Sequence, residues 1–546
     1  MAQNVTISGA SYSDVPAVTL PKTGGGTARF DDTSDANATA ADILEGKTAY
    51  VNGQKVTGTA TAGGSGGITQ DAQGYLVLDE EGGSGGGSQP SGSDANIADP
   101  IRFFDYDGTL VASYTAVPTS LPSVPTHSNL KNGTWNYTLE QITTQFNAMG
   151  TCDVGANYMT VSEATEIDIV LQEGRLHPYL SLAINGTVSI DWGDGSTPDT
   201  STGTSLTSRK SNIHHIYEQA GSYTIKITKT SGTGYALYCT STYTLLNKNT
   251  VYTAQAYVYT NCIRAVRVGP DCTVGNYAFY YCHHLTSISI PSDVVGIGTY
   301  TFYYCYSLKS ATIPSGITGI QNYMFGYCYG LTSVSMPSSV TSLGSSAFQN
   351  CVSLTSVSIS SGVASLGSSV FGSCYSLRSV KLPSGVTSIG SSAFSGCYRF
   401  TSMNLPSTLT TIPINLFLNC NGLTSVSLPS GITSIDSSTL SGCVSLLSVS
   451  IPSEVTSIGN NAFTNCHALV SVTIPSKVTS IGTNAFSNCE GVAEYHIKPA
   501  APPTLAGTNA FNAISPDCII YVPSSKLSDY QTAENWSTYA SYMVGE

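Results

Sequence analysis

The stretch LVSVTIPSKVTSIGTNAFSNC, residues 469–489, is one copy of a unit that fills the second half of the chain. Its closing cysteine recurs at intervals of 23 residues, and a phenylalanine, or leucine in one copy, stands three positions before it. A unit this short cannot bury its own apolar face, so neighbouring copies must stack into a solenoid with one continuous core. The cysteines are Cys282, Cys305, Cys328, Cys351, Cys374, Cys397, Cys420, Cys443, Cys466 and Cys489.

Each unit has the spacing of two short extended segments and a turn. Leu423, Val426 and Leu428 give the pattern of a strand, and Pro429 ends it. A Val-x-x-Ile-Gly segment forms a second extended piece, and Ala-Phe-x-x-Cys closes the rung. We therefore expect a mainly β fold in which about ten 23-residue rungs form a solenoid over residues 233–498. A C-terminal cap should follow over 499–546, with one helical face formed by Leu527, Tyr530, Trp536, Tyr539 and Met543.

The repeat closely resembles the BspA-like leucine-rich repeat over about 280 residues. This resemblance implies a leucine-rich-repeat solenoid that acts as a recognition or adhesion scaffold, and it implies no catalytic residue. Upstream, Trp192-Gly-Asp-Gly195, His215-Ile-Tyr217 and Tyr223-Thr-Ile-Lys-Ile are similar to a polycystic-kidney-disease (PKD) domain. That likeness implies an immunoglobulin-like β-sandwich over residues 160–232, and the period-2 alternation of its segments agrees.

The N-terminal part has a different composition. Residues 1–60 contain a hairpin signal at Asn52-Gly53, and residues 61–98 have the Gly/Ser-rich composition of a flexible linker. Residues 99–159 are expected to form a small β-rich connecting domain. The unit ILEGKTAYVNGQKVTGT resembles a module of bacteriophage tail and baseplate proteins, and so does the order of modules in the chain. This resemblance implies an N-terminal attachment module over residues 1–60.

Two short motifs match known functional motifs, but the sequence context of each argues against that function. FDYDGT, with Asp105 and Asp107, matches the start of haloacid-dehalogenase-like phosphatases. Such an enzyme needs a domain-sized α/β layer after this strand, whereas here Asp107-Gly108 fits a two-residue hairpin turn. LPKTG at residues 20–24 matches the sortase anchoring motif but lies at the wrong end of the chain, so we interpret it as a loop.

The remaining polar residues give weak signals for metal or hydrolytic sites. The 15 cysteines lack the clustered pairs of zinc sites and fit a buried ladder of free thiols, with some disulfides as an alternative. Asp191, Asp194 and Asp199 could hold calcium, although the Gly-Asp-Gly segment is already explained as a turn. The sparse acidic residues of the repeats, such as Asp293 and Glu454, do not form the close carboxylate pair of a glycosidase. We expect no cofactor, no metal and no enzymatic activity.

Tyrosine is the feature with the strongest binding signal. Three consecutive units place tyrosines at matching positions, which stacking should superpose as one patch: Tyr277, Tyr280, Tyr281, Tyr300, Tyr303, Tyr304, Tyr306, Tyr323, Tyr327 and Tyr329. Tyrosine supplies a large, rigid contact area at low entropic cost, as in antibody paratopes. The alternative is that these rings only cover apolar surface beside an irregular first rung.

These observations favour a bacteriophage tail fibre or baseplate appendage that adheres to a host cell. The N-terminal region would bind other tail or baseplate proteins, and the solenoid would bind a cell-surface glycan or protein. The analogy with tail fibres implies a homotrimer. A net charge of −13 argues against nucleic-acid binding, and no apolar window is long enough for membrane insertion. Without a visible signal peptide, we expect assembly in the host cytoplasm and residence in the virion. The alternatives are a bacterial surface adhesin and an envelope-polysaccharide-degrading tail enzyme.

Overall fold

In the computed structural model, the described residues are eight strands within the first 91 residues and, beyond them, 99–105, 109–127, 130–160, 164–240, 245–246, 260–292, 294 and 296–546. The eight strands form consecutive antiparallel pairs. They are β1 (Gln3–Ile7), β2 (Ala10–Val15), β3 (Val18–Pro21), β4 (Thr27–Phe30), β5 (Thr48–Val51), β6 (Gln54–Thr57), β7 (Ile68–Gln70) and β8 (Leu76–Leu78). β5 and β6 pair as the predicted hairpin, while Asn52-Gly53 and residues 22–24 of the LPKTG motif lie outside the described residues.

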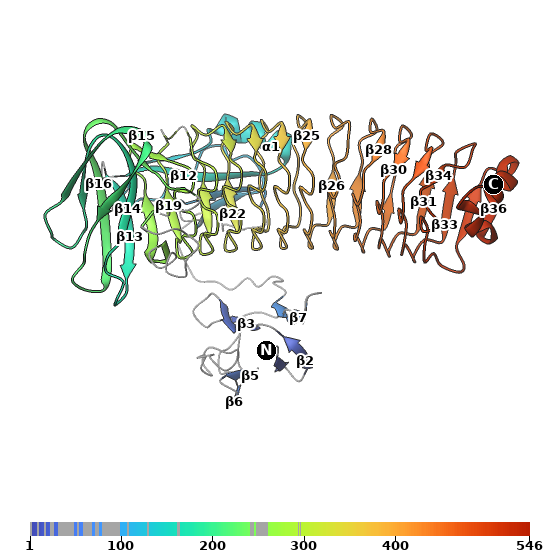
Figure 1. Ribbon diagram of the computed structural model, residues 1–546, viewed down its shortest axis with the longest axis horizontal. Coiled ribbons are helices and arrows are strands. Elements are labelled where there is room, and N and C mark those ends of the chain that lie inside the picture. Colours follow the sequence, from blue (N-terminus) through green and yellow to red (C-terminus); the bar gives the residue numbers. More distant parts are fainter. Residues whose placement is uncertain are drawn as a thin grey trace. The chain divides into compact units, whose positions relative to one another are not determined.

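The second half of the chain forms a β-solenoid of about 12 turns, as predicted from the repeat (Figure 1). Strands of successive rungs pair in parallel and in register, so that Ser333 lies opposite Ser310. One column contains β17 (Ile263–Arg267), β19 (Ser287–Ser289), β20 (Ser310–Thr312), β22 (Ser333–Ser335), β26 (Ser402–Asn404), β27 (Ser425–Ser427), β29 (Ser448–Val449), β31 (Ser471–Ile474), β33 (Glu494–Ile497), β35 (Ile519–Val522) and β36 (Met543–Gly545). The other contains β18 (Cys272–Val274), β21 (Gly319–Ile320), β23 (Ser342–Leu343), β24 (Ser365–Leu366), β25 (Ser388–Ile389), β28 (Ser434–Ile435), β30 (Ser457–Ile458), β32 (Ser480–Ile481) and β34 (Thr504–Leu505).

The repeated phenylalanine and cysteine build the core of this stack. Phe371, Phe394 and Phe417 lie face to face with ring centroids 5.7 and 5.8 Å apart. The Cys305 thiol donates a hydrogen bond to the Phe279 carbonyl oxygen at 3.2 Å, and the same bond recurs in the following rungs. All 15 cysteines are free and buried, and burial raises the pKa of the Cys397 thiol to about 12. The cysteines therefore act as small apolar side chains, as expected for structural thiols.

The strands predicted for the sandwich are joined to the solenoid by hydrogen bonds. β13 (Thr165–Leu171), β14 (Tyr179–Asp191), β15 (Asp199–His214) and β16 (Gly221–Leu237) are antiparallel in the order β15-β14-β16-β13. The sheet continues from β13 to β17 and β19, and the end of β16 pairs with β18. The predicted boundary at residue 232 therefore falls inside β16. The physical reason is that the first rung has open strand edges, which β13 and β16 cover.

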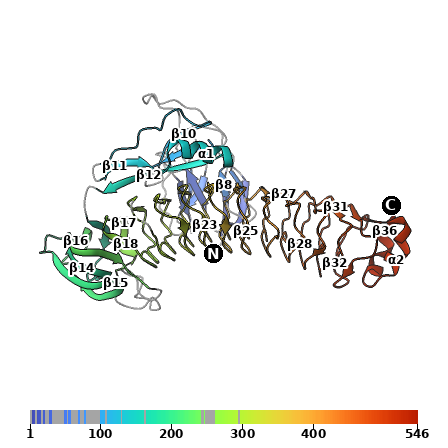
Figure 2. The ribbon, with the colours of Figure 1, turned by 90° about the horizontal axis from the view of Figure 1, so that it is seen from above.

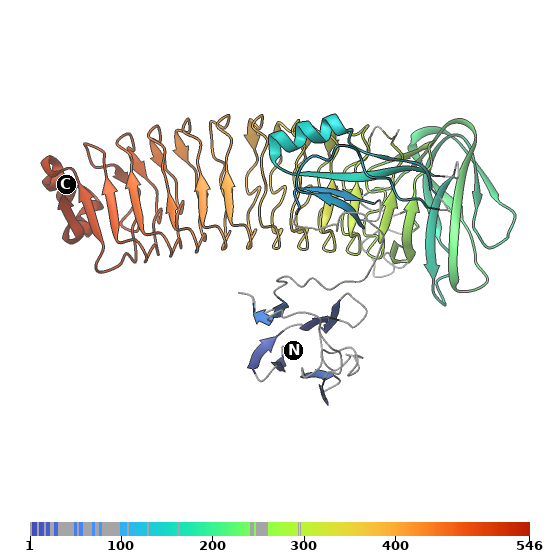
Figure 3. The ribbon, with the colours of Figure 1, turned by 180° about the vertical axis from the view of Figure 1, so that it is seen from behind.

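Residues 99–160 form a layer that lies along the side of the solenoid (Figures 2 and 3). It contains β9 (Ile101–Phe104), β10 (Leu110–Tyr114), β11 (Leu130–Trp135), α1 (Leu139–Met149) and β12 (Cys152–Thr160), with sheet order β10-β9-β12-β11. The sequence predicted a small β-rich domain here, and α1 was not predicted. The packing of this layer on the rungs was not predicted either. A Cβ atom on Gly155 would lie 2.7 Å from the Thr312 side chain, so only glycine permits this approach.

Hydrogen bonds fix this layer to the rungs. Tyr137 donates its hydroxyl proton to the Met336 carbonyl oxygen at 2.5 Å. The buried Gln145 amide donates to the Ile359 carbonyl oxygen at 2.6 Å and accepts from the Ser361 amide at 2.7 Å. Because these partners are main-chain groups of the repeat, the layer is held by the solenoid backbone itself.

The C-terminal segment, residues 499–546, was predicted to be a cap. Its strands β34, β35 and β36 continue the solenoid sheets, and its helical part is not one continuous helix. It contains η3 (Ser524–Lys526), α2 (Leu527–Thr532) and η4 (Trp536–Tyr542). Tyr530 and Trp536 are buried, and the Trp536 indole donates to the Pro503 carbonyl oxygen at 2.6 Å. Asn535 has a φ of 64°, which interrupts the helix between α2 and η4. In the part of the chain that the structure describes, no helix is long and apolar enough to cross a bilayer.

Candidate binding surface

The predicted tyrosines occupy the turn that closes each of three consecutive rungs. In the first of these turns, the amides of Tyr277, Phe279 and Tyr281 each donate to a carbonyl oxygen of the next rung at 2.9 Å. Tyr277 and Tyr281, two positions before and after the buried Phe279, take positive φ angles of 58° and 61°. These angles point the alternate amides along the stack. The solenoid thus imposes a left-handed backbone at two positions of the turn.

Later rungs fill these two positions with residues that tolerate this conformation. The left-handed positions hold tyrosine at 277, 281, 300, 304, 323 and 327. The following rungs hold smaller residues there, mostly Asn and Ser, with Gly396, Gly442 and Ala513. Asparagine and glycine adopt positive φ readily, whereas it is an outlier for a bulky residue. The first three rungs therefore hold tyrosine where the backbone disfavours it.

The ten tyrosines come together as one surface, here called the tyrosine patch. Its rings form columns along the stack: Tyr277, Tyr300 and Tyr323 are parallel with centroids 4.9 and 4.6 Å apart. A second column contains Tyr280 and Tyr303, and a third contains Tyr281, Tyr304 and Tyr327. In the fourth, His283 stacks on Tyr306 at 4.4 Å and Tyr306 on Tyr329 at 4.7 Å. Edge contacts, such as Tyr303 to Tyr304 at 4.5 Å, join neighbouring columns.

The patch is a surface feature of neutral phenols. Nine of its side chains are half-buried, and Tyr329 is 38% exposed. Burial, with smaller contributions from Tyr304 and Tyr327, raises the pKa of Tyr303 well above its ordinary value. The Tyr303 hydroxyl therefore stays protonated at neutral pH and can both donate and accept hydrogen bonds.

Stability alone does not explain the choice of tyrosine. A residue held in a sparsely populated backbone region costs about 1–3 kcal/mol, while an aromatic pair contributes about 0.5–1.5 kcal/mol beyond its buried area. Tyr304 takes part in four such ring contacts, so its stacking is at least of the same order as the strain. Asparagine at the same positions would lower the strain, and later rungs stack with it in place of tyrosine, which favours a role for the rings beyond folding.

The acidic residues of the phosphatase-like motif and of the possible calcium site have structural partners. Asp105 lies 2.8 Å from the His127 imidazole, and β9 pairs antiparallel with β10, as predicted for a hairpin; Asp107 and Gly108 lie outside the described residues. Asp191 and Asp194 accept main-chain hydrogen bonds within their own turn. Asp199 accepts the indole proton of the buried Trp192 at 2.8 Å.

The acidic residues of the repeats that were considered for hydrolytic chemistry include Glu454 and Asp293. Glu454 pairs with Lys477 at 2.6 Å, and Asp293 lies outside the described residues. Among the side chains that the structure describes, no three His, Cys, Asp or Glu groups gather in a way that could hold a metal ion.

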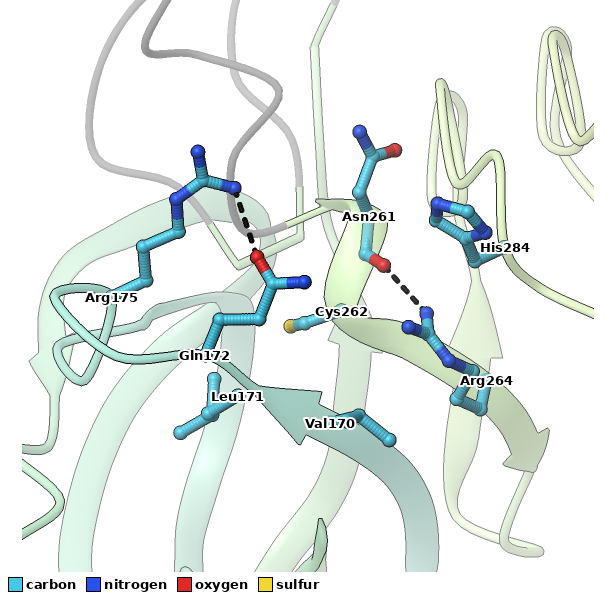
Figure 4. A pocket seen from close by; sticks show the side chains of 8 residues that line it. All are labelled: Val170, Leu171, Gln172, Arg175, Asn261, Cys262, Arg264 and His284. Atoms are coloured by element: carbon cyan, nitrogen blue, oxygen red, sulfur yellow. Dashed lines mark hydrogen bonds between the residues drawn. The ribbon is translucent and has the colours of Figure 1, made fainter. Parts of the chain in front are cut away.

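A polar pocket lies where the β13–β16 sheet meets the first rung (Figure 4). Its lining comes from three separate parts of the chain: Val170, Leu171, Gln172, Arg175, Asn261, Cys262, Arg264 and His284. From the sequence, His283-His284 is expected to be stacked or exposed, with no set of metal ligands around it, and neither arginine is singled out. No local pattern could have revealed this pocket, because its residues meet only through the pairing of β13 with β17.

Comparison with known proteins identifies the repeat. A profile of the BspA type leucine-rich repeat region matches residues 272–400 and 365–493, in six copies. The rungs are BspA-type leucine-rich repeats. No curated protein matches the chain.

Solved structures with a likeness to the chain include three bacterial proteins. A leucine-rich repeat protein from Bacteroides ovatus is 24% identical, over 49% of this chain and 89% of that one, with a TM-score of 0.30. A leucine rich cell surface protein from Faecalibacterium prausnitzii is 29% identical, over 45% of this chain and 76% of that one, with a TM-score of 0.32. A leucine-rich repeat protein from Eubacterium ventriosum is 20% identical, over 53% of this chain and 90% of that one, with a TM-score of 0.31.

Proposed function

We propose that the BspA-type solenoid is a non-enzymatic recognition module that binds a cell-surface glycan or protein through the tyrosine patch. This proposal rests on the presence of tyrosine at six left-handed turn positions that later rungs give to smaller residues, Asn, Ser, Gly or Ala. Because the later rungs stack without these rings, we infer that their value lies in what they contact. Aromatic faces with a polar tip are suited to sugar rings and to protein surfaces alike.

For the protein that carries this module, we propose a bacteriophage tail fibre or baseplate appendage. The support is the order of segments along the chain: a unit similar to phage tail modules, a Gly/Ser-rich segment, a segment similar to a PKD domain, and the repeats. In this proposal the N-terminal region binds other tail or baseplate proteins, and the chain is assembled in the host cytoplasm into the virion. A homotrimer is proposed by analogy with other tail fibres only.

A bacterial surface adhesin is the second candidate, favoured by the BspA-type repeats themselves. Antibodies against the solenoid separate the two. Labelling of tail structures in particles released by lysis supports the first proposal. Labelling of the surface of intact producing cells, without labelled particles, replaces it with the second.

The binding proposal is tested by retention of the full chain on envelopes of candidate host bacteria. A fragment that begins at residue 233 is unsuitable because it would cut β16. The informative variant changes Tyr281, Tyr304 and Tyr327 to Asn, the residue that several later rungs hold at this left-handed position, for example Asn350 and Asn419. The matched control is Tyr398→Asn, because Asn421 holds the equivalent position in the next rung.

The expected result is saturable retention of the native chain and the control, and loss of retention by the triple variant at unchanged folding. Equal retention of all three would move the binding site away from the patch. No retention of the folded native chain on any envelope would contradict a recognition role.

A further inference from the structure

The pocket at the junction of sheet and solenoid is built by both. Gln172 and Arg175 follow β13, Asn261 and Arg264 lie in η2 (Thr260–Cys262) and β17, and His284 belongs to the next rung. Figure 4 shows the polar ends of Arg175, Gln172, Asn261 and His284 gathered above the β13 and β17 strands. The cavity measures about 130 Å³, an order of magnitude above the space that one water molecule requires by this measure.

The charge of this pocket is unusual for the chain. The protein has a net charge of −13 and only 21 Lys and Arg residues. Three residues beyond Arg264, Arg267 pairs with both Glu166 and Asp168. Arg175 and Arg264, by contrast, form no ion pair with any described residue, and both line the same cavity. Two guanidinium groups at one cavity, neither of them ion-paired among the described residues, create a local positive site on an acidic protein.

Hydrogen bonding holds part of this site in place and leaves donors unused. Arg264 donates through one nitrogen, Nη1, to the Asn261 carbonyl oxygen at 2.6 Å, which orients its guanidinium group. Arg175 has a single long hydrogen bond, 3.4 Å, to the Gln172 side chain. A guanidinium carries five N–H donors, so both arginines retain unused donors within the described structure. The fork of donors on arginine matches the paired oxygens of a carboxylate or phosphate.

The pocket and the tyrosine patch are linked through two consecutive residues. His284 lines the pocket, and the preceding His283 stacks on Tyr306 in the fourth column. A ligand that reaches both sites would lie on the rings and place a charged substituent in the pocket.

We infer that this pocket binds a compact oxyanion, a carboxylate or phosphate, carried by the surface glycan that the tyrosine patch contacts. The inference rests on the proposed function and narrows it to acidic glycans. Arg175 and Arg264 bind the oxyanion, and the rings contact the neutral part of the chain of sugars.

The test measures affinity of the full chain for three immobilised oligomers: an oligogalacturonate, a glycerol-phosphate oligomer, and a neutral galactan oligomer. The variants are Arg175→Ala, whose side chain has little structural role, and Arg264→Gln. The control is Arg378→Ala, an exposed arginine of the solenoid outside the pocket. Removing a charge-assisted hydrogen bond is expected to weaken binding about tenfold or more.

The inference predicts binding of at least one anionic oligomer, weakened by both pocket variants and unchanged in the control. The oligomer that binds distinguishes carboxylate from phosphate. The idea is overturned if neither anionic oligomer binds, or if Arg175→Ala and Arg264→Gln bind as the native chain does. Failure of the proposed function looks different: the Tyr281, Tyr304 and Tyr327 variant then keeps its envelope retention, whatever the arginine variants do.

Discussion

The imidazole of His283 lies face to face with the phenol ring of Tyr306, with centroids 4.4 Å apart and planes inclined by 11°. Burial, and to a lesser extent the neighbouring His284, lowers the pKa of His283 to about 4. The unfolded chain binds this proton near pH 6.5, so between about pH 6.5 and 4 the unfolded state holds more protons than the folded one. Stability of the first rungs should therefore fall as the pH drops through this window.

This pH dependence is tested with His283→Tyr, which continues the tyrosine column. Thermal unfolding followed across pH 4 to 7, the window that the pKa shift defines, should show a smaller loss of melting temperature on acidification in the variant than in the native chain. His467→Tyr is the control, because His467 holds the same position of a later rung but is exposed. An identical pH profile for the native chain and His283→Tyr would contradict the account.

The left-handed positions make a second prediction about stability. Tyr304→Asn removes four ring contacts but should lower the free energy of unfolding by no more than about 3 kcal/mol, because relief of backbone strain offsets part of the lost stacking. Tyr304→Val should destabilise clearly, since a β-branched residue tolerates positive φ poorly and does not restore the stacking. Denaturant unfolding of both variants checks this. A large loss for Tyr304→Asn would mean that the rings serve folding after all.

The phenylalanine column supports the solenoid core. Phe394 is fully buried between Phe371 and Phe417, so Phe394→Ala should cost about 3–5 kcal/mol. Phe394→Leu should cost less, since Leu440 fills the same position in another rung. Urea unfolding of both variants measures the difference. A silent Phe394→Ala substitution is incompatible with stacked rungs that share one core.

The layer over residues 99–160 should depend on Gln145. Gln145→Ala leaves the Ile359 carbonyl oxygen and the Ser361 amide without their partner, at a cost of about 1–3 kcal/mol each if they stay buried. We expect faster amide hydrogen exchange in α1, measured by mass spectrometry, with the far rungs unchanged. Thr144→Ala, an exposed substitution on the same helix, is the control. Unchanged exchange in α1 would show that these bonds do not hold the layer.

Sequence reasoning succeeded where the signal repeats and failed where it depends on contacts between distant segments. The constant 23-residue spacing of Cys and Phe places equivalent residues of successive rungs on top of one another. The solenoid core and the gathering of the tyrosines were therefore predictable. Helix α1 carried a readable signal that was missed, the capping box of Thr138 and Gln141. The packing of the 99–160 layer on the rungs has no such signal in the sequence, because Gln145 and Ile359 are 214 residues apart. The positive φ of Tyr281 could not be predicted from the local sequence either, since only the hydrogen bond to the next rung requires it.

If the tyrosine patch is the surface that contacts the ligand, the ligand should shield its rings from oxidation. Hydroxyl-radical footprinting of the full chain, with and without saturating envelope fragments from a bacterium that retains it, measures this shielding. We expect lower oxidation of Tyr306, Tyr327 and Tyr329 on binding, with unchanged oxidation of Tyr521 near the C-terminal cap. Protection confined to other rungs or to the cap, with the patch oxidised as in the free protein, would contradict it.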